Sequence, residues 1–440
     1  MDEKNLPLLV WMAHVPVVTL IDLDDVKAVT NAFVQKPYHY NFGRIWLGNG
    51  LVTAPTSIWK YSIKKIGGTF TSNIVNGYQE VFNRQAQKLV ITLRGKVGSP
   101  PFNIIDHLAF TTLETICQTA LGVPDLKCFV TEEYYQAFTE SLELLLERFL
   151  NPLMHVDAIY KLTPQYRRMK KSVSILHNVS KTAINKRYNE WKEKKMQKGK
   201  DREENEFPDK KFKSFLDVLL ELSSEDPHFS PEQIQAEVDT IIVGGQETTA
   251  RSLLFILLMI GCKKQIHEKL SAEIQEIFGD STRPVKHEDL LRMTYCEAVI
   301  MEALRLFPPI PYVARQADKD LQLKSCLVPK GTMCGLLILG AGRSHRIWGP
   351  DADQYRPERW LQPDVDTTAF YPFSYGRRSC IGKKYSMALM KTMLAHCIRE
   401  FNFTSNAENL RLSAHITLEP LTGNLLQVHS RKLLDKPVKA

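Results

Sequence analysis

The sequence predicts a mainly α-helical protein with a small β part. Most stretches with a regular apolar pattern repeat every three to four residues, which is the period of a helix with one buried face. Runs that alternate like strands are short and lie near the two ends of the chain and after residue 320. The length of 440 residues allows two domains or one large one.

The expected elements follow in chain order. Strands are expected over residues 8–12, 17–21, 321–323 and 332–339, with β hairpins between 410 and 434. Helices are expected over residues 22–31, 57–66, 103–121, 132–149, 164–195, 230–262, 264–278, 293–307 and 381–401.

The helix that starts at Ser230 has the clearest signals. Ser230 suits the N-cap, Pro231 the first helical position, and Gln233 completes a capping-box pattern. A helix of about 30 residues is about 45 Å long, the width of a domain. Because it is apolar on most faces, we expect it to be buried along its length.

Composition excludes several classes of protein. No apolar run reaches 18 residues, which predicts no transmembrane helix, and the mixed charges at the start do not form a signal peptide. The net charge of +8 (57 basic minus 49 acidic residues) suits an acidic partner or an anionic membrane better than nucleic acid, because acids are interleaved with the bases. The charged stretch over residues 192–213 is interpreted as a solvated loop.

Cysteine usage indicates a reducing compartment, because the eight cysteines occur singly and form no CxxC pair. Most should be buried, inert thiols. The cysteines are Cys117, Cys128, Cys262, Cys296, Cys326, Cys334, Cys380 and Cys397.

Cys380 stands in a segment suited to metal ligation. It is expected at a loop-to-helix junction, where unsatisfied N–H groups point toward a thiolate, and two arginines before it would lower the pKa of the thiol. Phe373 offers an apolar wall, Gly376 permits a tight loop, and Gly382 leaves room for a flat macrocycle. Taken alone, Cys380 would more often be an ordinary buried thiol.

The pattern Phe-x-x-Gly-x-Arg-x-Cys-x-Gly resembles the haem-binding signature of the cytochromes P450. The resemblance implies one catalytic domain over residues 1–440, with a long central helix over the haem and the cysteine loop beneath it. It also implies non-covalent haem b with Cys380 as the axial ligand of the iron. The haem-binding residues would include Phe373, Gly376, Arg378 and Gly382.

A second motif lies inside the long helix, at Gly244-Gly245-Gln246-Glu247-Thr248-Thr249. Two glycines in a buried helix cost about 1 kcal/mol each relative to alanine, so they need a reason. The Thr248 hydroxyl can bond the Gly244 carbonyl and bend the helix, although a tolerated irregularity explains the pattern equally well. The segment resembles the family's oxygen-activation motif, in which Thr248 holds dioxygen and a water, Glu247 is the neighbouring acid, and Gly245 lies at the haem.

A third motif is Glu302-Ala303-Leu304-Arg305, whose spacing places both charges on one helix face. Alone it would be a surface ion pair of little energetic value. It resembles an internal pair of the family that a second arginine joins, and Pro357-Glu358-Arg359 matches that partner segment. The resemblance implies a structural triad of Glu302, Arg305 and Arg359, which is not catalytic.

Two further residues are similar to haem-propionate contacts of the family. Trp59 matches a tryptophan in a helix, but Ile63 stands where the family usually has a basic residue four positions later, so Lys60 or Lys64 is the candidate to replace it. Arg315 matches a second position, where an arginine pairs with a carboxylate through two hydrogen bonds.

Two segments resemble family 4, the fatty-acid omega-hydroxylase group, in an insect-like branch. They are Glu237-Val238-Asp239-Thr240 and Trp46-Leu47-Gly48-Asn49-Gly50-Leu51. Many vertebrate members carry a haem-linking glutamate where this chain has Gly244, so no covalent haem link is expected. The family's membrane anchor and hinge do not precede the first strands, which we interpret as an N-terminal truncation.

The resemblance implies a monooxygenase that inserts one oxygen atom from O2 into a lipophilic substrate, such as a fatty acid, hydrocarbon, terpenoid or xenobiotic. Electrons would come from NADPH–cytochrome P450 reductase, with cytochrome b5 as a further partner, at the cytosolic face of the endoplasmic reticulum membrane. A haem-thiolate isomerase or dehydratase, and an inactive haem- or lipophile-binding fragment, remain as alternatives.

Two groups of residues are expected to contact the substrate and the reductase. The apolar pocket candidates are Tyr38, Phe42, Ile241, Val313, Ala314 and Leu421, each equally explained by core packing. The basic candidates for docking an acidic reductase are Lys60, Lys64, Lys65, Arg377, Lys383, Lys384 and Lys391, each equally explained as general basic surface.

Overall fold

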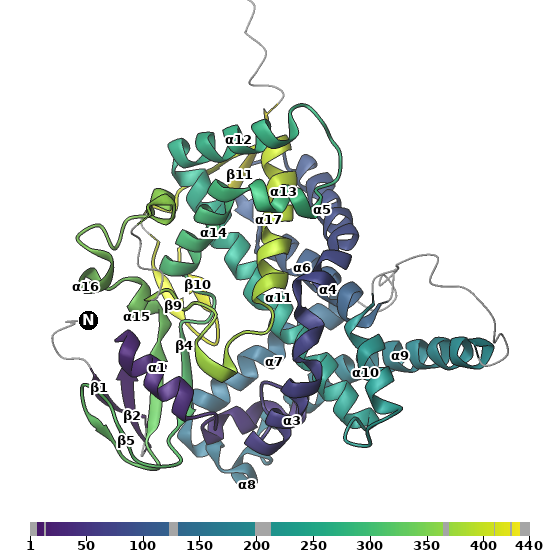
Figure 1. Cartoon of the computed structure of the whole chain (residues 1–440), viewed down its shortest axis with the longest axis vertical. Helices are drawn as coiled ribbons and strands as arrows, with labels where there is room; N and C mark the ends of the chain where they lie inside the picture. The colour runs from purple at the N-terminus through teal and green to yellow at the C-terminus, as the bar shows by residue number, and fades with distance from the viewer. Residues whose placement is uncertain are drawn as a thin grey trace, which may run out of the picture. The chain divides into compact units, whose positions relative to one another are not determined.

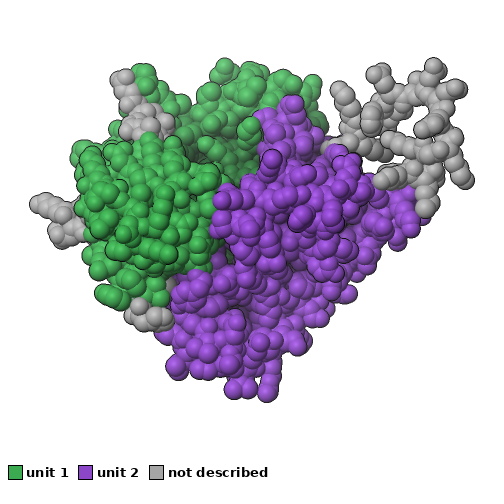
Figure 2. Space-filling view, turned by 60° about the horizontal axis from the view of Figure 1, so that its bottom comes forward, with its two compact units in different colours: residues 1–37, 82–112, 247–440 green, residues 38–81, 113–246 purple. Residues whose placement is uncertain are grey.

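The computed structural model describes residues 7–12, 15–122, 131–198, 213–363, 369–408, 410–422 and 425–431, with side chains of 194–198 excepted, and confirms a mainly α protein with a small β part (Figure 1). Of the expected charged loop at 192–213, residues 199–212 lie outside these residues, and 192–198 are helical, so for that part the loop expectation is wrong. Two compact units are distinguished (Figure 2). Unit 1 comprises residues 1–37, 82–112 and 247–440, and unit 2 comprises 38–81 and 113–246. Each unit joins segments distant in sequence, and the single catalytic domain stays a prediction.

The helices of unit 1 lie largely at the positions expected from sequence. Helix α12 (Lys264–Phe278) matches the expected range, and α14 (Thr294–Leu306) and α17 (Lys383–Glu400) differ from theirs by one or two residues at each end. The helix expected over residues 22–31 is α1 (Leu23–Ala32). The helical segments of unit 1 that were not expected are α5 (Gln79–Arg94, from the unit boundary), α13 (His287–Arg292), α15 (Ile338–Gly342), α16 (His345–Trp348), η5 (Pro357–Leu361) and η7 (Gly376–Arg378).

The sheets of unit 1 are small. The largest has the strand order β1 (Leu8–Met12), β2 (Val15–Leu20), β7 (Met333–Leu337) and β4 (Tyr312–Gln316). Strands β2 and β7 run parallel, and β4 and β7 antiparallel with Val313 opposite Leu336. The buried Val26 and Val29 of α1, and Phe33 directly after it, share a core with this sheet. The other strands are β3 (Phe102–Asn103), β5 (Leu321–Gln322), β6 (Leu327–Val328), β8 (Phe401–Ser405), β9 (Leu412–Ala414), β10 (Leu418–Pro420) and β11 (Leu425–Ser430).

The helices of unit 2 include α3 (Thr56–Ile66), α7 (Glu132–Leu150) and the long α9 (Pro164–Lys198). They agree with the expected helices to within three residues. The other helical segments are η2 (Tyr38–Gly43), α2 (Arg44–Leu47), η3 (Gly67–Phe70), α4 (Ser72–Gly77), η4 (Pro152–His155), α8 (Asp157–Tyr160) and α10 (Phe215–Ser223). Helix α6 (Ile105–Leu121) crosses from unit 1 into unit 2.

Helix α11 (Pro231–Cys262) continues from unit 2 into unit 1 at Glu247. The Ser230 cap is confirmed, because its Oγ accepts the Gln233 N–H at 3.3 Å. The second half of the capping box is not confirmed, because no hydrogen bond from the Ser230 N–H to Gln233 Oε1 is seen among the described residues. The Gln233 amide nitrogen donates to the Asn49 carbonyl and to Glu237. By length and hydropathy α11 would suit a membrane span, but 67% of that stretch is buried inside the protein, as in a core helix.

Candidate functional site

The loop before α17 holds Cys380 in a fixed backbone conformation. Gly376 has φ +71°, and a Cβ atom there would lie 2.7 Å from the Thr30 carbonyl oxygen of α1, so both backbone and space require glycine. The Cys380 N–H donates to the Phe373 carbonyl at 2.8 Å and closes the loop. Ser374 also has positive φ, at 61°, which places strain beside the cysteine.

The Cys380 sulfur accepts hydrogen bonds from the N–H groups of Gly382 and Lys383, at the start of α17. Burial by the surrounding protein raises the pKa of this thiol, and the two N–H groups and the charge of Lys383 oppose that rise. The side chain is nevertheless accessible to solvent, so the sulfur is surrounded by protein but can be reached. Such a thiol can donate to a metal, and metal binding would deprotonate it.

The arginines before Cys380 do not act on the thiol as expected. Arg377 is exposed and donates to the Asn31 carbonyl at 3.0 Å, while the Arg378 Nε atom donates to the Val34 carbonyl at 3.0 Å. The positive charge that lowers the thiol pKa belongs to Lys383. That ammonium also lies 5.7 Å from the centre of the Phe373 ring, which is half-buried.

Three cations converge beside the loop, and sequence reasoning named only two of them. The Gln35 carbonyl accepts the Gln316 N–H at 2.9 Å, so the segment that carries Lys36 lies beside Arg315 as well as Arg378. Desolvation by burial holds the pKa of Lys36 well below its usual value, and the positive charges of Arg378 and Arg315 lower it further. Three positive groups held this closely favour an anion between them, and two carboxylates on one ligand suit them best.

The oxygen-activation candidates lie on the unbroken helix α11. Glu247 Oε1 accepts from the Nε atom of Arg251 at 2.8 Å and from the Thr417 hydroxyl at 3.3 Å. The Thr248 carbonyl accepts from the Ser252 hydroxyl at 2.8 Å. The Glu247 carboxylate is therefore ion-paired with Arg251, which the sequence motif did not indicate.

The two glycines of this motif have different surroundings. A Cβ atom on Gly245 would lie 2.7 Å from Ile116 of α6, so close helix packing explains this glycine without any haem contact. A Cβ atom on Gly244 would meet no side chain or distant backbone within 4 Å among the described residues. The assignment of Gly245 to haem binding stays a prediction.

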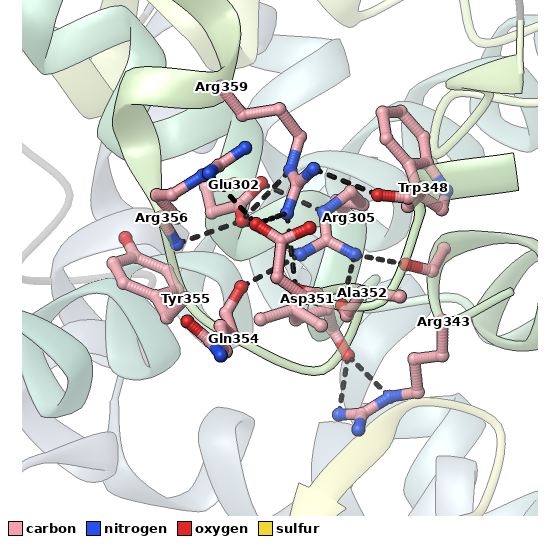
Figure 3. A network of polar contacts seen from close by, with 12 residues as sticks. Glu302, Arg305, Arg343, Trp348, Asp351, Ala352, Gln354, Tyr355, Arg356 and Arg359 are labelled. Atoms are coloured by element: carbon pink, nitrogen blue, oxygen red, sulfur yellow. Dashed lines mark hydrogen bonds and ion pairs between the residues drawn. The ribbon is translucent and has the colours of Figure 1, made fainter. Parts of the chain in front are cut away.

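The structure brings Glu302, Arg305 and Arg359 together in the interior of unit 1 (Figure 3). Arg305 binds both carboxylate oxygens of Glu302 at 2.8 Å, and the Nε atom of Arg359 lies 3.7 Å from Glu302 Oε1. The Glu302 carboxylate also accepts the Arg356 N–H and the Trp360 indole N–H. Arg305 and Arg359 donate to main-chain carbonyls in the segment 342–354. This network fixes an irregular segment that has little secondary structure of its own.

The donor set fits a haem. Cys380 offers a reachable sulfur with two N–H donors, and Lys36, Arg315 and Arg378 offer a place for carboxylates. The family model for cytochrome P450 matches residues 7–426.

The chain is a cytochrome P450.

Curated relatives belong to family 4. Cytochrome P450 4V2 of Mus musculus is 32% identical over 441 residues, covering 98% of this chain and 83% of that protein. Cytochrome P450 4V2 of Homo sapiens is 31% identical, with the same coverage. Cytochrome P450 4c3 of Drosophila melanogaster is 30% identical over 438 residues, covering 96% of this chain and 81% of that protein. As a member of the family, this cytochrome P450 is a haem-b monooxygenase with a cysteine-ligated iron that acts on lipophilic substrates.

The two segments that resemble family 4 contact each other in unit 2 of this cytochrome P450. The carboxylate of Glu237 accepts the Leu51 N–H at 2.9 Å. A Cβ atom on Gly50 would lie 2.1 Å from the Thr240 hydroxyl, and one on Gly48 would lie 2.9 Å from Ala236. The segment 46–51 can therefore lie against the first turns of α11 only because it carries glycines.

The remaining candidates have mixed outcomes. Trp59 is buried in α3, whose neighbouring Tyr61 donates its hydroxyl to Asp226. The expectation that Lys391 belongs to a docking surface is wrong, because it is buried and donates to Glu297 at 2.6 Å. Leu421 has an exposed fraction of 65%, so the expectation that it lines a pocket is not supported.

Proposed function

We propose that Cys380 is the cysteine that ligates the haem iron, and that the chain oxidises apolar substrates with electrons from NADPH–cytochrome P450 reductase. The observation that carries this proposal is the Cys380 sulfur, which is reachable and accepts two N–H groups at the start of α17. N–H donors moderate the negative charge of a thiolate, and this helps to set the potential of its metal.

The haem carboxylates are assigned to the cluster of Lys36, Arg315 and Arg378. Arg315 is 2% exposed, so its guanidinium is positioned for an internal ligand. Lys36 offers a further hydrogen-bond donor beside the two arginines, although burial holds its pKa well below the usual value. The assignment of Trp59 to a haem carboxylate stays a prediction from the resemblance, and Phe373, Gly376 and Gly382 are proposed to shape the protein around the sulfur.

Bound haem supplies the redox chemistry that activates dioxygen and transfers one oxygen atom to a carbon–hydrogen bond. The protein must deliver protons to this reaction. We assign this task to Thr248, as the residue that holds a proton-donating water, and to Glu247, as the acid beside it. Arg251 and Thr417 bind only Oε1 of Glu247, and the structure gives Oε2 no partner among the described residues, which leaves an oxygen for proton exchange.

The electron donor is proposed to bind a basic surface of unit 1 formed by Arg377, Lys383 and Lys384, all three of which are exposed. Lys383 lies beside Cys380, so a partner bound there approaches the thiolate side of the site. An acidic flavoprotein suits such a surface electrostatically, with cytochrome b5 as a further partner. Lys60, Lys64 and Lys65 of unit 2 are also exposed, although Lys65 pairs with Asp226.

The protein is proposed to act at the cytosolic face of the endoplasmic reticulum membrane. Five apolar side chains within thirteen residues of unit 2 have exposed fractions between 44% and 81%, which is unusual for a surface that faces only water. They are Leu150, Leu153, Val156, Ile159 and Leu162. A lipid surface also concentrates the proposed substrates, which are fatty acids, hydrocarbons, terpenoids or lipophilic xenobiotics.

The test is the reduced carbon monoxide difference spectrum of the haem-loaded chain. A Soret band typical of thiolate-ligated haem supports Cys380, and Cys380→His should move the band toward that of histidine-ligated haem. A wild-type spectrum of the histidine type would refute the proposal. Turnover of a fatty acid with NADPH and reductase tests the reaction. Thr248→Ala should divert electrons from product to peroxide, and unchanged coupling would reject the proton-delivery role.

A further inference from the structure

Glu247 belongs to a chain of polar side chains that leads from α11 to the hairpin of β9 and β10 in unit 1. Arg251 donates through Nε to Glu247 at 2.8 Å and through Nη2 to Glu419 of β10 at 2.7 Å. His415 lies between the two strands, and its Nδ1 atom is 3.7 Å from the second oxygen of Glu419. The exposed fractions rise from 14% for Glu247 and Arg251 to 32% for Glu419 and 46% for His415.

One guanidinium is therefore shared between two carboxylates. Arginine stays charged at any ordinary pH and cannot carry a proton itself, so Arg251 acts here as an anchor. Glu419 of the hairpin accepts a hydrogen bond from the Arg251 guanidinium and so positions it. The Nε atom of the same guanidinium then donates to Glu247 Oε1. The same hairpin contributes the Thr417 hydroxyl, which is buried and donates to the same oxygen.

We propose that Glu419 is a positioning residue for Glu247, acting through Arg251. This inference rests on the proposed role of Glu247 as the proton-delivering acid. Glu419 divides the attraction of Arg251 between two anions, so Glu247 is oriented without being held tightly. Without the Glu419 charge, the whole attraction of Arg251 falls on Glu247, and the carboxylate is held more tightly at Oε1 and turns less freely toward a proton-donating water.

The first test uses Glu419→Gln, which keeps the side-chain shape and removes the charge. Product formed per NADPH consumed should fall about three- to ten-fold, with KM for substrate unchanged and a larger solvent isotope effect on product formation. Glu419→Asp, which keeps the charge, should restore part of the coupling. The matched control is Glu400→Gln, which removes another half-buried carboxylate of unit 1 that pairs with Arg94 at 3.0 Å.

Epistasis separates this inference from the function on which it rests. If Glu419 acts through Glu247, the double variant Glu247→Gln/Glu419→Gln should couple no worse than Glu247→Gln alone. Normal coupling in Glu247→Gln would refute the proton role of Glu247 itself. An uncoupled Glu247→Gln together with a Glu419→Gln variant that behaves like Glu400→Gln would overturn only the present inference.

A second readout needs no turnover. Thermal unfolding of the two single variants and the double variant forms a cycle around Arg251. Because either carboxylate alone can still balance the half-buried guanidinium, losing both should lower Tm by about 2–4 °C more than the sum of the single losses. Strictly additive shifts in Tm would contradict a shared Arg251.

Discussion

The Nε2 atom of His177 lies 3.5 Å from the Oδ2 atom of Asp239, and the same nitrogen is 2.7 Å from the Trp46 carbonyl. Burial raises the pKa of Asp239 to about 7, and desolvation lowers the pKa of His177. Asp239 and His177 therefore do not form a strong ion pair near neutral pH, because burial disfavours the charged form of each. The interior of unit 2 holds a carboxyl group that titrates in the physiological range.

We predict that Asp239→Asn flattens the dependence of stability on pH. The folded-state pKa of Asp239, about 7, exceeds the ordinary value of 3.8, so the folded protein binds this proton more tightly than the unfolded chain. The resulting stability is complete below about pH 4 and is lost as the pH rises to about 7, by at most about 4 kcal/mol. Tm at pH 5 and pH 8 should differ by about 3–6 °C less in the variant.

The control for Asp239 is Asp318→Asn, because Asp318 is exposed in unit 1. Its curve should follow the wild type. Glu237, whose pKa burial raises to about 6, leaves a smaller slope of the same sign in Asp239→Asn. Equal slopes in the wild type and Asp239→Asn would show that Asp239 is already ionised well below pH 7.

Lys36→Gln should have opposite effects on the haem-loaded and the haem-free protein. Loss of one charged hydrogen-bond donor should speed haem transfer to apomyoglobin about ten-fold. The haem-free chain should unfold at a higher temperature, because a cation beside Arg315 and Arg378 has been removed. Lys36→Arg serves as the charge-conserving control and should retain haem. A Lys36→Gln protein that releases haem at the wild-type rate would exclude Lys36 from the carboxylate site.

The two glycines around Cys380 should respond differently to alanine. Gly376→Ala forces a side chain into positive φ and against the Thr30 carbonyl, so the haem-free protein should lose about 1–3 kcal/mol or fail to fold. Gly382 has negative φ, and among the described residues a Cβ atom there would meet only the Cys380 sulfur, at 3.8 Å. Gly382→Ala should therefore leave the haem-free Tm unchanged and weaken haem binding, as measured by titration. Unchanged haem affinity would mean that the macrocycle does not approach Gly382.

The exposed apolar residues of unit 2 should bind lipid. Leu153 and Leu162 are 70% and 81% exposed, and changing both to serine should weaken binding to vesicles with anionic lipids about ten-fold or more. Leu291→Ser is the matched control, because Leu291 is also 70% exposed but lies in α13 of unit 1. Sedimentation with vesicles measures the effect. Equal losses of vesicle binding in both variants would indicate that exposed leucines bind lipid nonspecifically wherever they lie.

Local sequence signals predicted much of the secondary structure. Strand β1 and helix α12 have the expected bounds, and Ser230 caps α11 as its position suggests. Strand β4 was missed, because it is stabilised by pairing with β7, and Val313 gives no local sign of its partner Leu336. The Gln233 contact with the Asn49 carbonyl was missed for the same reason, since Asn49 is distant in the chain.

The motifs predicted the principal candidates of the site but not their electrostatic surroundings. Lys36 could be recognised as a site residue only from its position beside Arg315 in the fold. The role of Arg251 could be inferred only from its hydrogen bond to Glu419. Lys391 could have been recognised as internal, because it stands among the apolar residues of α17 rather than in a polar stretch. Charge at a helical position does not by itself indicate exposure when every neighbouring turn is buried.

The contact between residues 46–51 and the start of α11 also constrains how this sequence can vary. Leu51 and Glu237 are 186 positions apart, yet Gly50 and Thr240 compete for one small volume. A side chain at position 50 would also lie 2.3 Å from the Ala236 carbonyl oxygen, which a smaller residue at position 240 does not relieve, so glycine should be retained at position 50 among relatives that keep this contact. Chimeras between relatives should likewise inherit both segments from one parent, and a crossover placed between them should yield poorly folded hybrids.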